Sequence, residues 1–226
     1  MTTALAPTAP VEPVLPADLQ TPGEELFNTI SHGAGALLAI IGLVFMLLTV
    51  TDGGDSWQIV SATIYGITLI LLYLASTLYH ALPPGKAKRV FRRFDHIGIY
   101  LLIAGSYTII ALTELRDSVG WHLFGIEWGI AAFGITFKAV FGPRYELIST
   151  LGYVAMGWVV VFFIGDVVAE LPTGGLILLG LGGLFYTGGV PFILMDQKRR
   201  YFHSIWHLFV LGGSICHYFM AYYYLV

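Results

Sequence analysis

Charged residues and cysteine are both scarce in this chain. Only 11% of the 226 residues are Asp, Glu, Lys or Arg and 57% are hydrophobic, whereas a soluble domain is about 25% charged. This composition excludes an ordinary soluble globular domain. The single cysteine, Cys216, excludes an intramolecular disulfide and a zinc site built from several cysteines. Any metal must therefore be held by imidazole and carboxylate groups.

The first 22 residues lack the two features of a signal peptide. They are rich in Pro, Ala and Thr, carry no Lys or Arg, and contain no long apolar core. We expect residues 1–22 to form a disordered tail and residues 23–226 to form one transmembrane domain. Nothing in the chain indicates a nucleic-acid partner, and the oligomeric state stays open.

Runs of roughly 20 apolar residues, the length that crosses a bilayer, recur through the rest of the chain. They predict an all-α integral membrane bundle of seven transmembrane helices. Short connections make consecutive helices antiparallel neighbours. The predicted spans are residues 28–50, 57–80, 95–113, 122–141, 149–168, 174–195 and 203–226.

Basic residues fall almost entirely on one side of these spans. The connections at 81–94, 138–148 and 196–202 hold every Lys and Arg except Arg116. Because cytoplasmic loops carry the excess of Lys and Arg, the sequence predicts a multi-pass protein of the cell's inner (plasma) membrane. Its N-terminus is expected in the cytoplasm and its C-terminus outside.

Ionisable side chains inside membrane spans are costly and are functional candidates by default. Five of the seven histidines lie at the predicted cytoplasmic ends of spans, and only His122 and His217 lie towards the other face. The same layer contains further polar residues. Its members are Glu25, Asn28, His32, Ser76, His80, Asp95, His96, His203 and His207.

Three of these histidines are candidate ligands of one zinc ion. His203 and His207 are four residues apart and share a helix face, and His80 on another helix completes the set. Three protein ligands and an open fourth position are typical of catalytic zinc. Asp95 is then placed to act as general base, and Ser76, one turn before His80, to hold a water or donate to an oxyanion.

Structural interpretations of the same residues compete with this one. Single histidines at helix ends often cap carbonyl groups or lie at the lipid interface. Ser76 can bond the carbonyl four residues earlier, and Asp95 can be an N-cap. The remaining polar residues are interpreted as support that orients the ligands. These are Glu25, Asn28, His32 and His96.

Four motifs resemble the bacterial hemolysin III branch of the progestin and adipoQ receptor (PAQR) family. They are E-L-F-N-x2-S-H at 25–32, S-T-L-Y-H at 76–80, F-D-H-I-G-I-Y at 94–100 and H-S-I-W-H at 203–207. The likeness covers the chain after about residue 22. It places the chain near the alkaline ceramidases, in a superfamily of seven-helix proteins thought to be metal-dependent membrane hydrolases. By resemblance, the family's zinc ligands map to His80, His203 and His207, and its Ser and Asp map to Ser76 and Asp95.

Three functions remain open at this point. The first is a zinc-dependent hydrolase of a lipid amide or ester, with a membrane lipid as substrate, related to lipid homeostasis. The second is a cytolytic, pore-forming protein, which the far halves of the helices support poorly because they offer little polar surface. The third is a membrane sensor or receptor in which zinc only clamps helices together.

Overall fold

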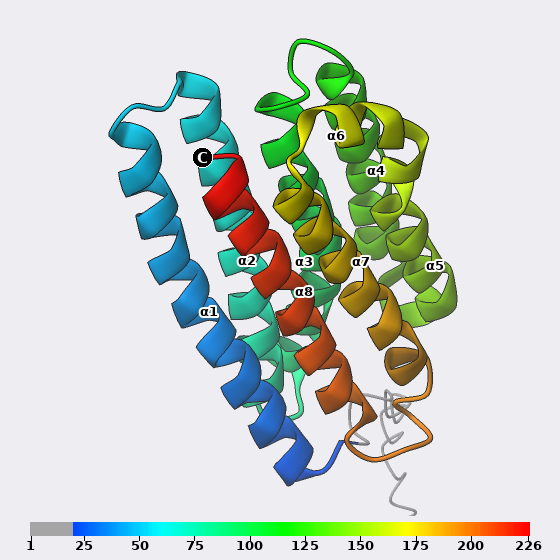
Figure 1. The fold of residues 1–226 in the computed structure, drawn as a ribbon. Coiled ribbons are helices and arrows are strands. Elements are labelled where there is room, and N and C mark those ends of the chain that lie inside the picture. The colour runs from blue at the N-terminus through cyan, green and yellow to red at the C-terminus, as the bar shows by residue number, and fades with distance from the viewer. Residues whose placement is uncertain (1–19) are drawn as a thin grey trace, which may run out of the picture.

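The structure is a computed structural model that describes residues 20–226, and these residues form helices joined by short irregular connections, with no strand. Figure 1 shows long helices packed side by side and running alternately in opposite directions. The elements are α1 (Pro22–Thr51), α2 (Ser56–Ala81), α3 (Lys86–Leu112), α4 (Gly120–Phe141), η2 (Gly142–Tyr145), α5 (Glu146–Gly157), η3 (Val159–Phe163), α6 (Ile164–Glu170), α7 (Thr173–Leu194) and α8 (Phe202–Tyr224).

Six segments among the described residues are helical, long and apolar enough to cross a membrane. Their outer surfaces are apolar: on α1, Leu26, Ile30 and Leu37 are each at least 60% exposed. Exposed apolar faces of this extent are stable in lipid and unfavourable in water. The structure therefore agrees with the prediction of a helical membrane bundle.

The fifth predicted span, residues 149–168, is not one continuous helix. The chain runs through α5, turns at Trp158, continues as the short 3-10 segment η3 and ends in α6. At this turn the hydroxyl of Tyr107 on α3 accepts from the Val160 amide at 2.9 Å and donates to the Gly157 carbonyl at 2.8 Å. A tyrosine thus satisfies backbone groups that a broken helix leaves unpaired inside a membrane, which the apolar pattern alone could not reveal.

The third helix also begins earlier than predicted. Residues 86–94 were expected in a basic loop, but they form the first turns of α3, and only residues 82–85 connect it to α2. Arg and Lys are good helix formers, so the charges do not interrupt the helix. As a result Asp95 lies inside α3 and is not its N-cap.

Small residues allow α2, α3 and α4 to pack closely. A Cβ atom at Gly105 on α3 would overlap the Thr68 side chain on α2, and one at Gly134 on α4 would overlap the Tyr100 ring on α3. Close backbone approach at glycine is a common basis of helix packing in membranes. The core of the bundle lies chiefly between α1, α2, α3 and α8.

The end of the bundle away from the histidines is fixed by an N-cap. The Asp55 carboxylate accepts from the amides of Trp57 and Gln58 at the start of α2 and pairs with Arg116 at 2.8 Å. The hydrogen bond from Arg116 and those from the backbone lower the pKa of Asp55 below its usual value. Because the folded-state pKa is lowered, the ionised Asp55 carboxylate stabilises the fold at neutral pH, and this stabilisation is lost as the pH falls through that pKa.

Of the predicted tail, residues 1–22, the first 19 residues lie outside the described part of the chain. Its last residues belong to the helical domain: Thr21 is the N-cap of α1, Pro22 is its first residue, and Thr21 and Glu24 form a reciprocal capping box.

Glu127 on α4 is fully buried, and neither carboxylate oxygen has a hydrogen-bond partner within residues 20–226. An unpaired buried polar group costs about 1–3 kcal/mol. We expect Glu127→Leu to raise the free energy of unfolding by about that amount, and the shape-conserving Glu127→Gln to change it little. Thermal unfolding in detergent measures both variants. A loss of stability in the leucine variant would show instead that Glu127 binds something the bundle needs.

Candidate metal centre

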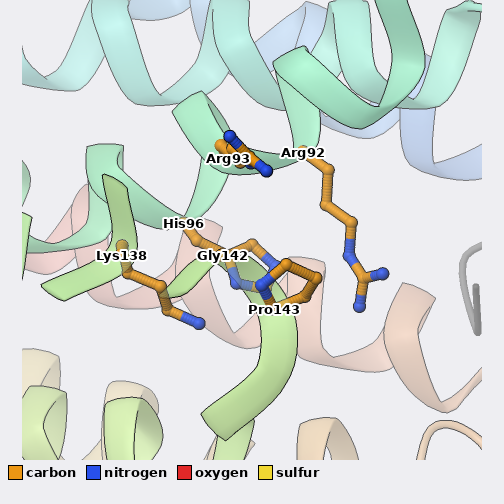
Figure 2. Close-up of a pocket in the computed structure, with 6 residues that line it drawn as sticks. All are labelled: Arg92, Arg93, His96, Lys138, Gly142 and Pro143. Carbon is orange, nitrogen blue, oxygen red and sulfur yellow. The ribbon is translucent and has the colours of Figure 1, made fainter. Parts of the chain in front are cut away.

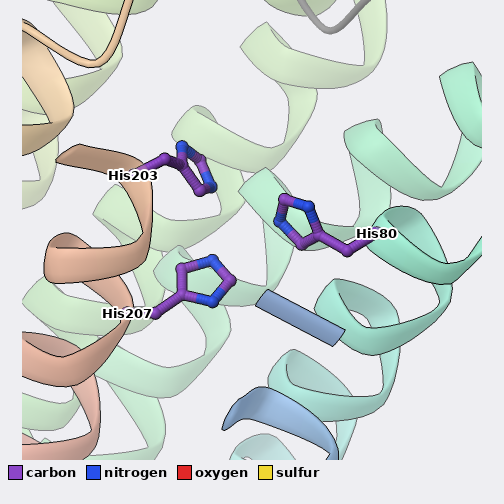
Figure 3. Close-up of side chains that lie close together, drawn as sticks. All are labelled: His80, His203 and His207. Atoms are coloured by element: carbon purple, nitrogen blue, oxygen red, sulfur yellow. The ribbon is translucent and has the colours of Figure 1, made fainter. Parts of the chain in front are cut away.

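His80, His203 and His207 lie together at one end of the bundle. His80 is near the C-terminal end of α2, and the other two occupy the first two turns of α8. Each offers a ring nitrogen, and these three nitrogens lie within 4.8 Å of one another. All three side chains are buried, and Figure 3 shows their rings gathered around a common centre.

The Nδ1 atoms of these rings have partners that fix their orientation. His80 Nδ1 lies 2.7 Å from a carboxylate oxygen of Glu25, His203 Nδ1 lies 2.9 Å from Asp196, and His207 Nδ1 lies 3.4 Å from the Ser31 hydroxyl. The Nε2 atoms of His80 and His203 are buried and have no partner among the described residues. A metal-binding histidine typically presents one nitrogen to the ion and donates the other to a carboxylate. The donor set therefore fits one divalent ion such as zinc.

An unusual backbone conformation begins α8 and places His203. Tyr201 is the only non-glycine residue with a positive φ in residues 20–226, at 60°. Its amide donates to the Glu24 carboxylate, which is also part of the capping box of α1. Non-glycine residues in the left-handed region cost energy and persist only where the surroundings enforce them. The start of α1 thus holds the start of α8 in register with His80.

Glu25 connects two elements to the histidine group. One carboxylate oxygen pairs with His80 and the other lies 2.9 Å from Lys88 Nζ on α3. Lys88 also donates to the carbonyls of Tyr79 and Leu82 at the end of α2, at 2.8 and 3.1 Å. Cations at a helix C-terminus stabilise its unpaired carbonyl groups. Lys88 therefore fixes both the end of α2 and the carboxylate that orients His80.

Ser76 and His32 form a hydrogen-bonded pair behind the histidine group. His32 Nδ1 lies 2.7 Å from the Ser76 hydroxyl, and the His32 ring stacks on that of His207 with centroids 3.5 Å apart. Ser76 also approaches the Asp95 carboxylate closely enough to interact with it. The structure thus brings Ser76, Asp95 and His32 to the same place as the candidate ligands.

Asn28 and His96 occupy different positions relative to this group. Asn28 accepts from the Ser204 hydroxyl at 2.7 Å and so ties α1 to α8 beside His203. His96 instead pairs with Glu146 at 3.2 Å, on the side of α3 that faces α5. The structure does not bring His96 into contact with the three candidate ligands.

A cavity of about 790 Å³ opens from the histidine group into the bundle. His203, His207 and Asp95 line one end, and the walls are mainly apolar side chains of α3, α5, α7 and α8. Leu147 and Val161 also line it and are 57% and 48% exposed. The size of the cavity is typical of a small-molecule site.

Several residues of this centre were not identified from the sequence. Asp196 lies seven residues before His203, but the residues between α7 and α8 form turns and not a helix, so only the conformation of this loop brings the two together. Lys88 was counted as a loop base that sets topology. Ser31 and Ser204 lie inside the quoted motifs, next to candidate site residues, and this position in the sequence could have identified them.

Replacement of Asp196 is expected to weaken zinc binding without abolishing it. Asp196→Asn removes the charge that orients His203 and strengthens its donor nitrogen, and such changes typically cost about 10–100-fold in metal affinity. Competition with a chromophoric chelator measures the affinity. Asp117→Asn is the control, because the Asp117 side chain is 94% exposed and pairs with Arg116 at the other end of the bundle. Equal affinities in both variants would contradict the role given to Asp196.

The comparisons with known proteins agree with the motifs. The family model described as "Haemolysin-III related" matches residues 20–218. The chain is 42% identical to the "Hemolysin-3 homolog" of Bacillus subtilis (strain 168) over 90% of its length and 95% of the relative's. It is 41% identical to "Hemolysin-3" of Bacillus cereus, over 90% and 92% of the two chains. It is also 32% identical to the human "Monocyte to macrophage differentiation factor", over 89% and 84%.

The matches cover nearly all of the helical bundle and include every candidate site residue. Together with the six long apolar helices they identify a multi-pass membrane protein. The chain belongs to the haemolysin-III related family, the hemolysin III branch of the progestin and adipoQ receptors that its motifs indicated.

Proposed function

We propose that the protein is a zinc-dependent hydrolase that cleaves an amide or ester bond of a membrane lipid. The observation that carries this proposal is that His203 and His207, two of the three grouped histidines, line the polar end of a large, mostly apolar cavity together with Asp95. The apolar part of such a cavity can hold the hydrocarbon chain of a lipid. The polar end of the lipid then lies beside the metal-binding histidines and the Asp95 carboxylate. The Leu147 and Val161 side of the cavity is the route by which a lipid enters from the bilayer.

His80, His203 and His207 would hold the ion, with Glu25 and Asp196 fixing the ring orientations of His80 and His203. Bound zinc supplies polarisation of the substrate carbonyl and lowers the pKa of water towards about 7. Asp95 accepts the proton of the attacking water at its carboxylate and returns it to the departing amine or alcohol. The Ser76 hydroxyl, held by His32 Nδ1, donates to the oxygen on which negative charge develops.

We further propose seven membrane passes with the histidine end in the cytoplasm. The apolar segment at residues 120–170 has 51 residues. A straight helix of that length would extend about 75 Å, more than twice the roughly 30 Å of a bilayer core. Figure 1 shows α4 and the run from α5 to α6 lying in opposite directions, which supports two passes. The concentration of Lys and Arg at the histidine end supports the N-in orientation in the cell's inner membrane.

Product release by purified protein tests the hydrolase proposal. Zinc-loaded protein is incubated with lipid amides and esters, and fatty acid release is followed by mass spectrometry, with chelator-treated protein beside it. Hydrolysis that is lost on chelation and restored by zinc supports the proposal. Absence of hydrolysis, together with dye leakage from liposomes that survives chelation, would support the pore that the relatives' name "Hemolysin-3" implies.

A further inference from the structure

A second group of charged side chains lies beside the metal centre, where α3, α4 and α5 meet. Glu146 at the start of α5 accepts from Arg92 at 3.3 Å, from Lys138 at 3.1 Å and from His96 at 3.2 Å. Arg92 is 9% exposed and Lys138 only 1%. One carboxylate therefore pairs with a buried guanidinium, a buried lysine amine and a histidine.

This group has more positive than negative charge. Asp95 is the other acid that faces Arg92 and Lys138, and Arg93 adds a third cation at the edge. Arg92 Nη1 is buried and has no hydrogen-bond partner within residues 20–226. Because buried donors in native proteins almost always have a partner, an unpaired guanidinium nitrogen indicates that an acceptor from outside residues 20–226 belongs there.

A small hollow adjoins the cluster. Figure 2 shows Arg92, Arg93, His96 and Lys138 around the turn at Gly142 and Pro143. Gly142 has φ of 59°, a conformation that favours glycine, and a Cβ there would lie 3.5 Å from Arg93 Nε. A side chain at this turn would therefore contact the Arg93 guanidinium.

Arg92 and His96 also line the large cavity, together with Lys198 from the segment between α7 and α8. Asp95, Glu146 and Asp196 line the same end. A molecule with its acyl chain in the apolar part of that cavity therefore has its polar end beside Arg92 and Lys198 as well as these carboxylates. Guanidinium and ammonium groups are the usual protein partners of phosphate, and guanidinium binds it in bidentate fashion.

We propose that the cavity selects a lipid with an anionic phosphate headgroup, and that Arg92 binds the phosphate with support from Lys138 and Arg93. This inference rests on the proposed function and names its substrate class: a phosphate-bearing lipid, in contrast to a neutral one such as ceramide. Glu146 remains paired with Lys138 and His96 and holds the cluster together while Arg92 turns its free nitrogen to the phosphate.

Native mass spectrometry of the purified full chain tests this selection. Wild-type protein is titrated with phosphatidylglycerol and with diacylglycerol of the same acyl chains, and separately with inorganic phosphate. We expect phosphatidylglycerol to bind at least about 10-fold more tightly than diacylglycerol, the ratio expected for one hydrogen bond to a charged group. Equal binding of the two lipids would overturn the proposal. Inorganic phosphate binding as tightly as phosphatidylglycerol would also overturn it, because the site would then take free phosphate.

A matched pair of variants locates the effect. Arg92→Gln is expected to reduce the preference for phosphatidylglycerol about 10-fold or more, whereas Lys86→Gln, which removes an exposed charge from the same end of α3, is expected to retain it. If both variants lose the preference for phosphatidylglycerol equally, the preference comes from general surface charge, and Arg92 is not the phosphate-binding residue. The wild-type comparison holds even if Arg92→Gln fails to fold.

Zinc content is measured on the same samples, which separates this inference from the proposed function. Loss of lipid selectivity in protein that contains zinc and hydrolyses lipid would refute only the headgroup site. Selective binding of phosphatidylglycerol by protein that never takes up zinc would support the headgroup site and refute the hydrolase.

Discussion

His80→Ala is expected to reduce zinc content from about one ion per chain to a small fraction of that, with His207→Ala giving the same result. His80 is the only candidate ligand that α2 contributes, so its loss leaves two ligands on α8 and no bridge between the helices. Loss of an outer partner already costs about 10–100-fold in affinity, and loss of a ligand costs more. Metal analysis of detergent-purified protein measures the effect.

The control for this experiment is His122→Ala. His122 is exposed and lies near the start of α4, at the opposite end of the bundle. Its replacement removes an imidazole without touching the centre, and zinc content is expected to stay at the wild-type value. Retention of zinc by His80→Ala, at the same level as the control, would mean that the three histidines do not form the binding site.

Asp95→Asn is expected to lower lipid hydrolysis by about 10²–10⁴-fold, the usual contribution of a general base, while zinc content stays near one per chain. The amide has the shape of the carboxylate but cannot accept the proton of the attacking water. Asp95 belongs to neither pair that orients His80 and His203, which are made by Glu25 and Asp196. The measurements are turnover and metal content on one preparation.

This variant separates catalysis from a purely structural role of the metal. If zinc only clamps α2 to α8, Asp95→Asn keeps both its metal and the biological effect of the wild type. Asp117→Asn, at the opposite end, serves as the charge-matched control and is expected to keep full turnover. Similar turnover in the two variants would exclude Asp95 as the base.

Sequence periodicity predicted the parts of the bundle that depend on local spacing. The four-residue interval between His203 and His207 placed both on one face of α8, and the basic residues correctly grouped five histidines at one end. The early start of α3 was missed because charge was interpreted as loop, although Lys and Arg are compatible with a helix. The break at Trp158 was missed because a tyrosine from α3 stabilises it, and apolar composition contains no sign of that contact.

In the candidate site, too, the residues placed by helix geometry could be predicted and those placed by turns could not. Residues that reach the centre through helix geometry, such as Ser76 and His80, could be found from the sequence. Asp196 and Glu146 reach their partners through turns and distant packing, which spacing cannot express. His96 was expected to orient a ligand or to face another way; adjacent helical residues point about 100° apart, and His96, next to Asp95, joins Glu146.

X-ray absorption at the zinc edge, combined with metal content on the wild-type protein, tests the central claim most directly. We expect about one zinc per chain with three imidazole nitrogens at about 2.0–2.1 Å and a further light-atom ligand. Protein that takes up no zinc after zinc is supplied, or that binds it without an imidazole shell, would contradict the metal centre and with it the hydrolase.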